Sequence, residues 1–182
     1  MASPLDLAHY IRSIPDFPKK GINFRDITTL LSDGPAFREC IDQLAAKLGH
    51  LGATKVVCAE ARGFIFGAAL AYKLGIGFVP VRKPGKLPAR TISVTYALEY
   101  GTDTLHMHAD ALAAGERVIV LDDLLATGGT CRAILQMILM QHAIPVGVGF
   151  LIELDALGGR AKLIEGLACS PLIDSLIHYT SE

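Results

Sequence analysis

The sequence predicts a single α/β domain in which helices flank a mainly parallel central sheet. Stretches that resemble strands alternate with stretches of helical periodicity, which is the pattern of βαβ units. Two nearly continuous apolar runs, at 118–121 and 146–151, are typical of strands buried on both faces. The chain has 182 residues, of which 51% are hydrophobic, so one domain with a sizeable core is expected.

The first 50 residues predict two helices separated by turns. Residues 5–14 have amphipathic spacing and are expected to form a short helix that ends before Pro15. Residues 15–26 contain two prolines and a glycine, which favour turns. Apolar residues recur at helical spacing over 35–49, with proline near the start and glycine at the end, and predict a second helix.

The rest of the chain alternates between the two kinds of element. We expect strands at 55–60, 77–81, 117–123, 145–154 and 171–178, and helices at 62–75, 130–141 and 157–165. Residues 82–90 are basic, contain two prolines and a glycine, and lack apolar periodicity, so a loop is expected there. Residues 91–108 alternate in polarity around Tyr100-Gly101, which predicts a β-hairpin.

Composition excludes several classes of function. The formal net charge is −1, so no global basic field for nucleic acid is expected, and any bound anion needs a local site. Four dispersed cysteines form no metal knuckle or redox pair. The first 15 residues do not resemble a signal peptide, and the charge-free stretch 133–152 is better explained as helix, turn and buried strand than as a membrane span. A cytoplasmic protein without a membrane partner is expected.

One junction between a strand and a helix, VIVLDDLLATGGT at 118–130, has the composition of a phosphate-binding loop. Gly128 and Gly129 allow a sharp turn, so that successive N–H groups and the positive end of the next helix can bind one oxyanion. Thr127 and Thr130 add hydroxyl donors. The loop is not a Walker motif, because no lysine follows the glycines, and it is not a GxGxxG fingerprint.

Two adjacent acids, Asp122 and Asp123, precede this loop. They would repel a phosphate, so ribose hydroxyls or the water molecules of a magnesium ion are their natural partners. The simpler alternative for the loop is a tight turn with a threonine cap, which does not account for paired acids. A second junction, CAEARGFIFG, places Arg62-Gly63 where a strand meets a helix. An arginine there can bind phosphate oxygens in a fork, or can simply lie on the surface beside a turn.

These motifs resemble a known family. VIVLDDLLATGGT is similar to the phosphoribosyl pyrophosphate signature of type I phosphoribosyltransferases. INFRDIT, EARGFIFG, FVPVRKPGKLP and LEYGTD occur in the order and spacing of the bacterial-type, adenine-specific branch, and together the matches cover residues 15 to about 155. The resemblance implies one domain over 1–182, with a base-binding hood within 1–34 and a flexible loop and hairpin over 82–108.

The resemblance also implies roles for individual residues. Those implied to bind 5-phosphoribosyl 1-pyrophosphate (PRPP) are Glu60, Ala61, Gly63, Arg82, Lys83, Asp122, Asp123, Ala126, Thr127, Gly128, Gly129 and Thr130; those implied to bind adenine are Asn23, Phe24 and Arg25; those implied to be catalytic are Arg62, Lys86 and Glu99. Mg²⁺ is the implied cofactor, held through the substrate rather than by protein ligands. A homodimer is also implied, with an interface that some of the loop cations would cross.

The implied reaction joins adenine to PRPP and yields AMP and pyrophosphate, a step of purine salvage. Its leaving group is highly charged, which suits Mg²⁺ together with Arg62, Arg82 and Lys86. Its oxocarbenium-like ribose must be kept from water, which a closing loop over 82–100 would do. Glu99 on its own is better explained as a charge at a hairpin end, and only the resemblance assigns it proton exchange with adenine.

Position 23 departs from the family pattern, in which an aliphatic residue is commoner than asparagine. Recognition of the base by backbone amides would tolerate Asn23, whereas recognition by its side chain would leave the choice of purine open. Three other functions compete with the implied one. The first is an enzyme for another purine, which the motifs RKPGKLP and LEYG oppose. The second is a regulator that only senses PRPP, which the presence of Lys86 and Glu99 opposes. The third is a kinase, which the missing Walker lysine opposes.

Overall fold

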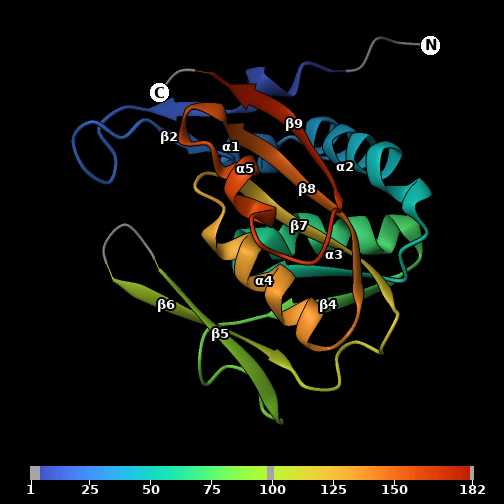
Figure 1. Cartoon of the computed structure of the whole chain (residues 1–182). Coiled ribbons are helices and arrows are strands. Elements are labelled where there is room, and N and C mark those ends of the chain that lie inside the picture. The colour runs from blue at the N-terminus through green and yellow to red at the C-terminus, as the bar shows by residue number, and fades with distance from the viewer. Residues whose placement is uncertain (1–4, 98–100, 181–182) are drawn as a thin grey trace.

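The computed structural model describes residues 5–97 and 101–180, and its centre is a five-stranded parallel sheet (Figure 1). The order of strands across this sheet is β4-β3-β7-β8-β9. They are β3 (Lys55–Ala59), β4 (Gly77–Val81), β7 (Arg117–Leu125), β8 (Ile144–Leu154) and β9 (Leu172–Tyr179). All neighbouring pairs are parallel, which confirms the predicted α/β architecture.

Helices cover both faces of the sheet (Figure 1). On one face lie α2 (Gly34–Leu48) and α3 (Arg62–Leu74), and on the other lie α4 (Gly129–Met140) and α5 (Gly159–Ile164). Successive residues of β7 therefore enter two different cores. Val118 and Val120 pack with residues of α4, whereas Ile119 and Leu121 pack with residues of α2 and α3. All four are fully buried, as expected for a strand covered on both faces.

Strands β3 and β7 mark the point where the order of strands reverses. From β3 the chain crosses to β4 on one side, and β7, β8 and β9 follow on the other. The pairing of β7 with β3 ends at Val57↔Val120, but its pairing with β8 continues to Leu125↔Glu153. Residues 122–125 thus lie past the last pairing with β3 and leave that edge open, where open α/β sheets bind ligands. The strand ends two residues later than predicted because β8 continues to supply partners.

The predicted hairpin is present, and it projects at the lower end of Figure 1. Its strands are β5 (Thr91–Ala97) and β6 (Thr102–His108), which pair from Thr91↔His108 to Ala97↔Thr102. The basic segment 82–90 is a loop, as predicted, and its first residue is tied to the hairpin. The N–H of Arg82 donates to the carbonyl of His106 at 2.9 Å, and the N–H of His106 donates back at 2.7 Å. Movement of this loop stays a prediction.

The N-terminal segment differs from the predicted helix over 5–14. Its elements are η1 (Leu7–Tyr10), β1 (Arg12–Ile14), β2 (Phe24–Asp26) and α1 (Thr28–Ser32). Pro15 explains the first difference, because a residue before proline is disfavoured in helical conformation and Ile14 is extended. The two short strands pair antiparallel and are joined by Arg12, whose guanidinium donates to Asp26 Oδ2 at 2.6 Å. We call the unit formed by these strands and the segment between them, residues 12–26, the hood.

Asp26 also explains why a helix follows the hood directly. Its carboxylate accepts from the N–H of Thr28 at 2.9 Å and so satisfies an N–H at the start of α1. This bond and the contact with Arg12 lower the pKa of Asp26 to about 2. Neither β2, which lies in the turn-rich segment 15–26, nor α1 was predicted, because an element of five residues or fewer shows no readable periodicity.

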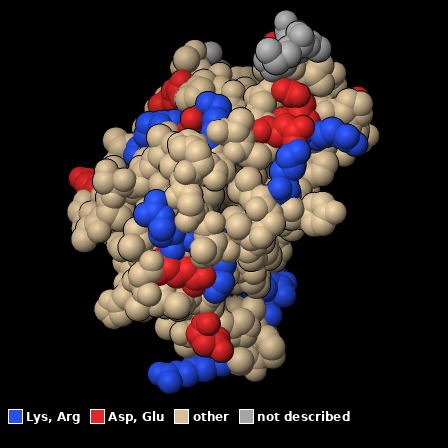
Figure 2. Space-filling model, turned by 90° about the vertical axis from the view of Figure 1, so that its right-hand side faces the viewer, with Lys and Arg blue, Asp and Glu red and all other residues tan. Residues whose placement is uncertain are grey.

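The remaining elements follow the predictions with small shifts. The charge-free stretch divides, as expected, into α4, a turn and β8, and the part of the chain that is described has no helix long and apolar enough to cross a membrane. A single turn, η3 (Asp155–Leu157), and a left-handed Gly158 come before α5, which therefore begins two residues later than predicted. A further turn, η2 (Gly49–Leu51), ends α2. On the face in Figure 2, basic and acidic side chains lie beside one another.

Candidate active site

The two adjacent acids meet the predicted arginine at the open edge of β7. Arg62, the first residue of α3, places Nε 2.7 Å from Oδ2 of Asp123. Asp123 is only 5% exposed, whereas Asp122 is half-buried and its Oδ1 accepts from the N–H of Asp123 at 2.9 Å. The loops after β3 and β7 thus converge, as expected for parallel strands whose carboxyl ends share one edge.

Burial determines the electrostatics of this pair. It raises the pKa of both carboxyls, and the neighbouring charge of Asp123 raises that of Asp122 further. Arg62 opposes this effect at both acids. Two carboxylates held close together in a partly dry site favour hydroxyl groups or a cation as additional partners.

Gly63 allows the two loops to approach. A Cβ at this position would lie 2.9 Å from Oδ1 of Asp122 and 3.4 Å from the carbonyl oxygen of Leu121. Contacts under 3.0 Å force a neighbour to move, so a side chain here would displace the acid. The predicted importance of Gly63 therefore has a steric cause, which is the close packing of α3 against β7.

Residues 126–130, which we call the phosphate-type loop, comprise the connection 126–128 and the first two residues of α4. They line a small pocket with Asp122 and Phe150. Gly128 has φ of 84°, a left-handed conformation that glycine adopts without strain, and α4 begins at the next residue. No side-chain hydrogen bond caps this helix, so its first N–H groups are available to an anion. The hydroxyl of Thr130 lies 3.3 Å from that of Tyr96, which brings the hairpin to the edge of this pocket.

Two cations of the basic loop, Arg82 and Lys86, and one main-chain N–H meet at Glu60. Arg82 donates to Glu60 Oε2 through Nε at 3.0 Å and Nη2 at 2.8 Å, and the N–H of Lys83 donates to Oε1 at 2.7 Å. Lys86 Nζ lies 3.5 Å from the same carboxylate. Burial opposes ionisation of Glu60, but these hydrogen bonds and charges outweigh it and lower its pKa. Ala61 follows as the residue that precedes α3.

A second, larger pocket lies between the hood and the end of β8. Its volume is about 310 Å³, which falls in the range of small-molecule sites. Its lining combines parts of the hood, the phosphate-type loop and the segment after β8: Lys19, Gly21, Ile22, Asn23, Arg25, Ala126, Leu154, Ala156, Leu157 and Tyr179. Ala126 also lines the first pocket, so the two pockets are neighbours that share one small residue.

The three predicted hood residues face different ways. Asn23 and Arg25 line the larger pocket, and Oδ1 of Asn23 is buried without a hydrogen-bond partner among the described residues. The guanidinium of Arg25 stacks 3.8 Å above the ring of Tyr179 and so braces the hood against β9. Phe24 is not part of the pocket lining. Its ring packs edge-on against Phe17, with centroids 5.2 Å apart, and lies 5.6 Å from the guanidinium carbon of Arg62.

Glu99 lies outside the described residues, so its role stays a prediction.

The pocket walls formed by Leu154, Ala156 and Leu157 were not predicted, although their position after a strand is a signal that could have indicated them. They follow a buried parallel strand, and β8 ends at the same edge as β7. The rule that ligands bind beyond strand carboxyl ends applies equally to that third loop.

Comparisons with known proteins agree with this geometry. A phosphoribosyl transferase domain model matches residues 28–160. The adenine phosphoribosyltransferase of Solidesulfovibrio magneticus is 60% identical over 159 residues, which span 87% of this chain and 93% of that protein. The solved adenine phosphoribosyltransferase of Thermoanaerobacter pseudethanolicus matches with a TM-score of 0.89 at 51% identity, over 96% of this chain and 98% of that one. The Saccharomyces cerevisiae enzyme, solved with adenine and an imino-altritol bisphosphate, matches with a TM-score of 0.86 at 36% identity, covering 94% and 96% of the two chains.

The raised pKa of Asp122 predicts a stability that depends on pH. Because the folded state favours the protonated carboxyl, folded protein binds more protons than unfolded protein above about pH 4, and this acid destabilises the fold as pH rises. Asp122→Asn is neutral at every pH and keeps the size of the side chain. We expect its melting temperature to match the parent near pH 4 and to exceed it increasingly towards pH 8.

Thermal unfolding followed by circular dichroism from pH 4 to 8 measures this difference. Asp123→Asn is the matched control, because it removes the partner of Arg62 and should gain less stability. A difference between Asp122→Asn and the parent that does not vary with pH would contradict the raised pKa.

Proposed function

The chain belongs to the adenine phosphoribosyltransferase family, and we propose that it converts adenine and PRPP to AMP and pyrophosphate. One observation carries the proposal furthest. Ala126 is shared by a pocket at a helix N-terminus and by a larger, mostly apolar pocket under the hood. A nucleoside monophosphate has the same layout, with an anionic 5′-phosphate at one end and a flat base at the other.

The acids at the open edge of β7, one of which lines the smaller pocket, suit the sugar. In this proposal Asp122 and Asp123 accept hydrogen bonds from the ribose 2′ and 3′ hydroxyls, while residues 126–130 bind the 5′-phosphate. Oxygen donors carrying excess negative charge also fit Mg²⁺, which prefers such ligands and retains part of its water shell. Mg²⁺ bound with PRPP would supply charge neutralisation at the hydroxyls and pyrophosphate. Arg62 orients Asp123 from the other side.

The leaving pyrophosphate is assigned to the cations near Glu60. The side chains of Arg82 and Lys86 share this one carboxylate, whereas the ammonium of Lys83 lies 3.2 Å from Asp103 Oδ2. An ionised carboxylate cannot itself hold a polyanion. We infer that pyrophosphate takes these cations from Glu60, while main-chain N–H groups of 61–63 contribute donors. The cations are therefore held near their place of use before substrate arrives, which reduces the reorganisation needed for charge stabilisation.

Base recognition is assigned to the hood. Arg25 is held by Tyr179 and by Ser13, whose hydroxyl accepts from Nη1, so it fixes the hood more than it reads the base. Asn23 lines the pocket, but its Oδ1 is buried without a hydrogen-bond partner among the described residues, so we infer that the backbone of 23–25 recognises the base. Leu157 and Ala156 supply the apolar walls on the other side of the pocket. A cytoplasmic location, where thiols such as Cys40 and Cys58 stay reduced, is part of this proposal.

The experiment that tests the function is an assay of base transfer. The protein is incubated with PRPP, Mg²⁺ and radiolabelled adenine, hypoxanthine, guanine or xanthine, and the labelled nucleotide is measured. AMP formation that far exceeds the other three products supports the proposal. Preferred transfer to an oxopurine would replace adenine by that base, and binding of PRPP without transfer to any base would favour a sensor.

Glu99 is proposed to exchange a proton with the adenine imidazole during transfer. Glu99→Gln keeps the size of the side chain but cannot carry the proton, so kcat should fall by about 10²–10⁴-fold while PRPP affinity changes little. Single-turnover AMP formation measured across pH tests this, since the variant should also lose the part of the pH profile due to that carboxyl. Asp110→Asn, which removes an exposed carboxylate beyond the hairpin, is the control. An unchanged rate and pH profile in Glu99→Gln would leave the proton to water or pyrophosphate.

Asn23→Val tests how the base is recognised. If the backbone reads the base, the variant should keep its preference for adenine over hypoxanthine within a few-fold. It should also melt at a higher temperature, because an unsatisfied buried carbonyl costs about 1–3 kcal/mol. Competition assays with the two bases and thermal unfolding provide both readouts. Loss of the adenine preference would instead place the Asn23 side chain against the base.

We also propose that the chain forms a homodimer through the outer face of α2 and α3. Tyr72 on α3 is 91% exposed, and its neighbour on the same face, Ile65, is 41% exposed. Next to Tyr72, a hollow lined by Phe37, Ile41 and Ala69 could receive an aromatic side chain from a second copy. Exposed aromatic anchors beside apolar hollows are typical of interfaces between subunits.

Tyr72→Glu should therefore shift the protein from dimer to monomer at micromolar concentration, because it places a charge in the apolar contact. Sedimentation velocity over a range of concentrations measures the shift. Met140→Glu is the control, since Met140 is 54% exposed at the end of α4 on the opposite face of the sheet. A parent protein that sediments as a monomer contradicts the dimer, and a dimeric Tyr72→Glu places the interface elsewhere.

A further inference from the structure

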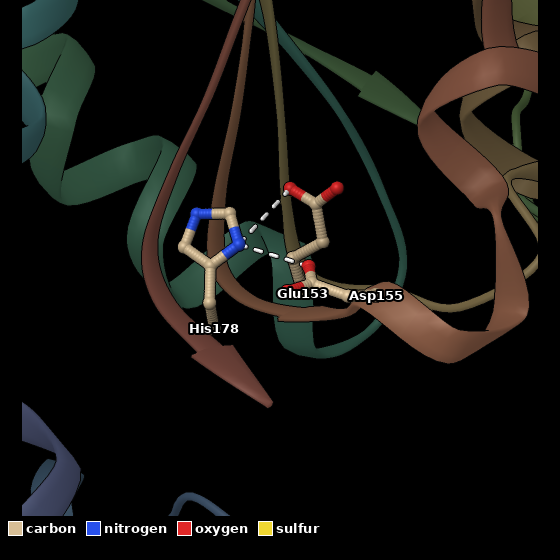
Figure 3. A group of neighbouring side chains, drawn as sticks. All are labelled: Glu153, Asp155 and His178. Carbon is tan, nitrogen blue, oxygen red and sulfur yellow. Dashed lines mark hydrogen bonds and ion pairs between the residues drawn. The ribbon is translucent and has the colours of Figure 1, made fainter. Parts of the chain in front are cut away.

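Three side chains of types that often bind metals meet at the end of β8 and β9. Figure 3 shows the ring of His178 directed at both Glu153 and Asp155. Its Nδ1 lies 2.9 Å from Asp155 Oδ1 and 4.0 Å from Glu153 Oε2. Glu153 is not free to bind a cation, however, because Arg160 already occupies both of its carboxylate oxygens. The cluster is therefore better explained as a brace than as a metal site.

The centre of this brace is the ion pair between Glu153 and Arg160. Arg160 donates through Nε to Oε1 at 2.9 Å and through Nη2 to Oε2 at 2.5 Å, and the hydroxyl of Ser175 adds a bond to Oε2 at 2.6 Å. The third nitrogen of Arg160, Nη1, donates to the carbonyl of Ile173 at 2.7 Å. Burial of Glu153 opposes its ionisation, but Arg160 and Ser175 outweigh this effect and lower its pKa. The forked geometry is the strong form of this interaction.

The pair closes a short segment, 154–159, which we call the wall segment. Glu153 precedes it at the end of β8, and Arg160 follows it in the first turn of α5. Asp155, within the segment, is held separately by His178 of β9. The wall segment is thus anchored at both ends and once in between, although it contains only one turn of 3₁₀ helix.

The wall segment touches both pockets of the proposed site. Leu154, Ala156 and Leu157 line the pocket under the hood. At the other end, a Cβ on Gly159 would lie 2.1 Å from the carbonyl oxygen of Ala126, and a Cβ on Gly128 would lie 3.0 Å from the carbonyl oxygen of Gly159. The segment therefore supports the loop 126–130 by direct backbone contact. Two glycines are required because no side chain fits between the two backbones.

We propose that Glu153 and Arg160 are positioning residues whose ion pair sets the base pocket and the 5′-phosphate loop as one unit. The identity of the two ligands rests on the function proposed above. A shift of the wall segment would move Leu157 at the base and Ala126 at the phosphate together. Loss of the pair should therefore weaken the binding of both substrates in parallel rather than that of adenine alone.

The test compares Glu153→Gln with a matched control. Glutamine keeps the shape of the side chain but replaces one acceptor with a donor, so it breaks the fork. Lys47→Met breaks a different ion pair, between Lys47 Nζ and Asp174 Oδ1 at 2.8 Å, which joins a helix to another strand of the same sheet, β9, and includes no residue of the wall segment. Lys47 and Arg160 side chains are similarly exposed, at 40% and 41%. Ser175→Ala, which removes one bond to Glu153 and leaves the ion pair, is the milder variant if Glu153→Gln fails to fold.

Two readouts are measured for each variant. The first is the KM for adenine and for PRPP, which we expect to rise together by about tenfold in Glu153→Gln, less in Ser175→Ala and not in Lys47→Met. The second is amide hydrogen exchange without ligand, which should accelerate at 154–159 and 126–130 together in the first two variants only. A change confined to adenine, unchanged exchange at 126–130, or the same effects in Lys47→Met would overturn the proposal.

Amide hydrogen exchange, which is measured without ligand, distinguishes failure of the positioning role from failure of the proposed function. If the parent protein transfers no adenine but the two segments still open together in Glu153→Gln, the proposed function fails and the mechanical link stands. If the parent is active and the segments do not respond to the substitution, only the positioning role is wrong.

Discussion

The site is built around a difference in length between two neighbouring strands. β7 continues for several residues past its last pairing with β3, because β8 still supplies hydrogen-bond partners on its other side. This leaves Asp122 and Asp123 on a regular strand with one side open, where the helix after β3 can reach them. A shorter β7 would place the acids in a loop, and a longer β3 would cover them. The paired charges are therefore held in position by ordinary sheet geometry.

Several charged side chains of this site form ion pairs with one another that a charged substrate could replace. Arg62 lies against Asp123, and Arg82 and Lys86 lie against Glu60, so these ionised groups have partners before any ligand arrives. Buried charges without partners would destabilise the fold, whereas paired ones can pass from a protein carboxylate to a substrate anion. In the proposed reaction, PRPP would change the partners of these groups without requiring new charges to enter the site.

Small residues determine how closely the loops approach one another. Gly63 admits α3 to β7, and Gly159 admits the wall segment to Ala126, in each case at a distance that a Cβ would not allow. Loops after three strands, β3, β7 and β8, consequently meet at one edge. The proposed link between Glu153, Arg160 and the phosphate loop follows from this packing, because backbones in direct contact cannot move independently.

The sequence by itself determined the order of elements, the two loops after β3 and β7, and the chemical character of both, because strand periodicity, glycine and paired charges are local signals. It misjudged the N-terminal segment, where β1 and β2 exist only through pairing and the Arg12–Asp26 contact, and it predicted no role for Leu157, Arg160 or Glu153. Only the tertiary structure decided which groups meet. It placed Phe24 near Arg62 rather than in the hood pocket, gathered Arg82 and Lys86 on Glu60, and joined two pockets at Ala126. Such contacts depend on crossover connections and strand register, which side-chain pattern within a single segment does not encode.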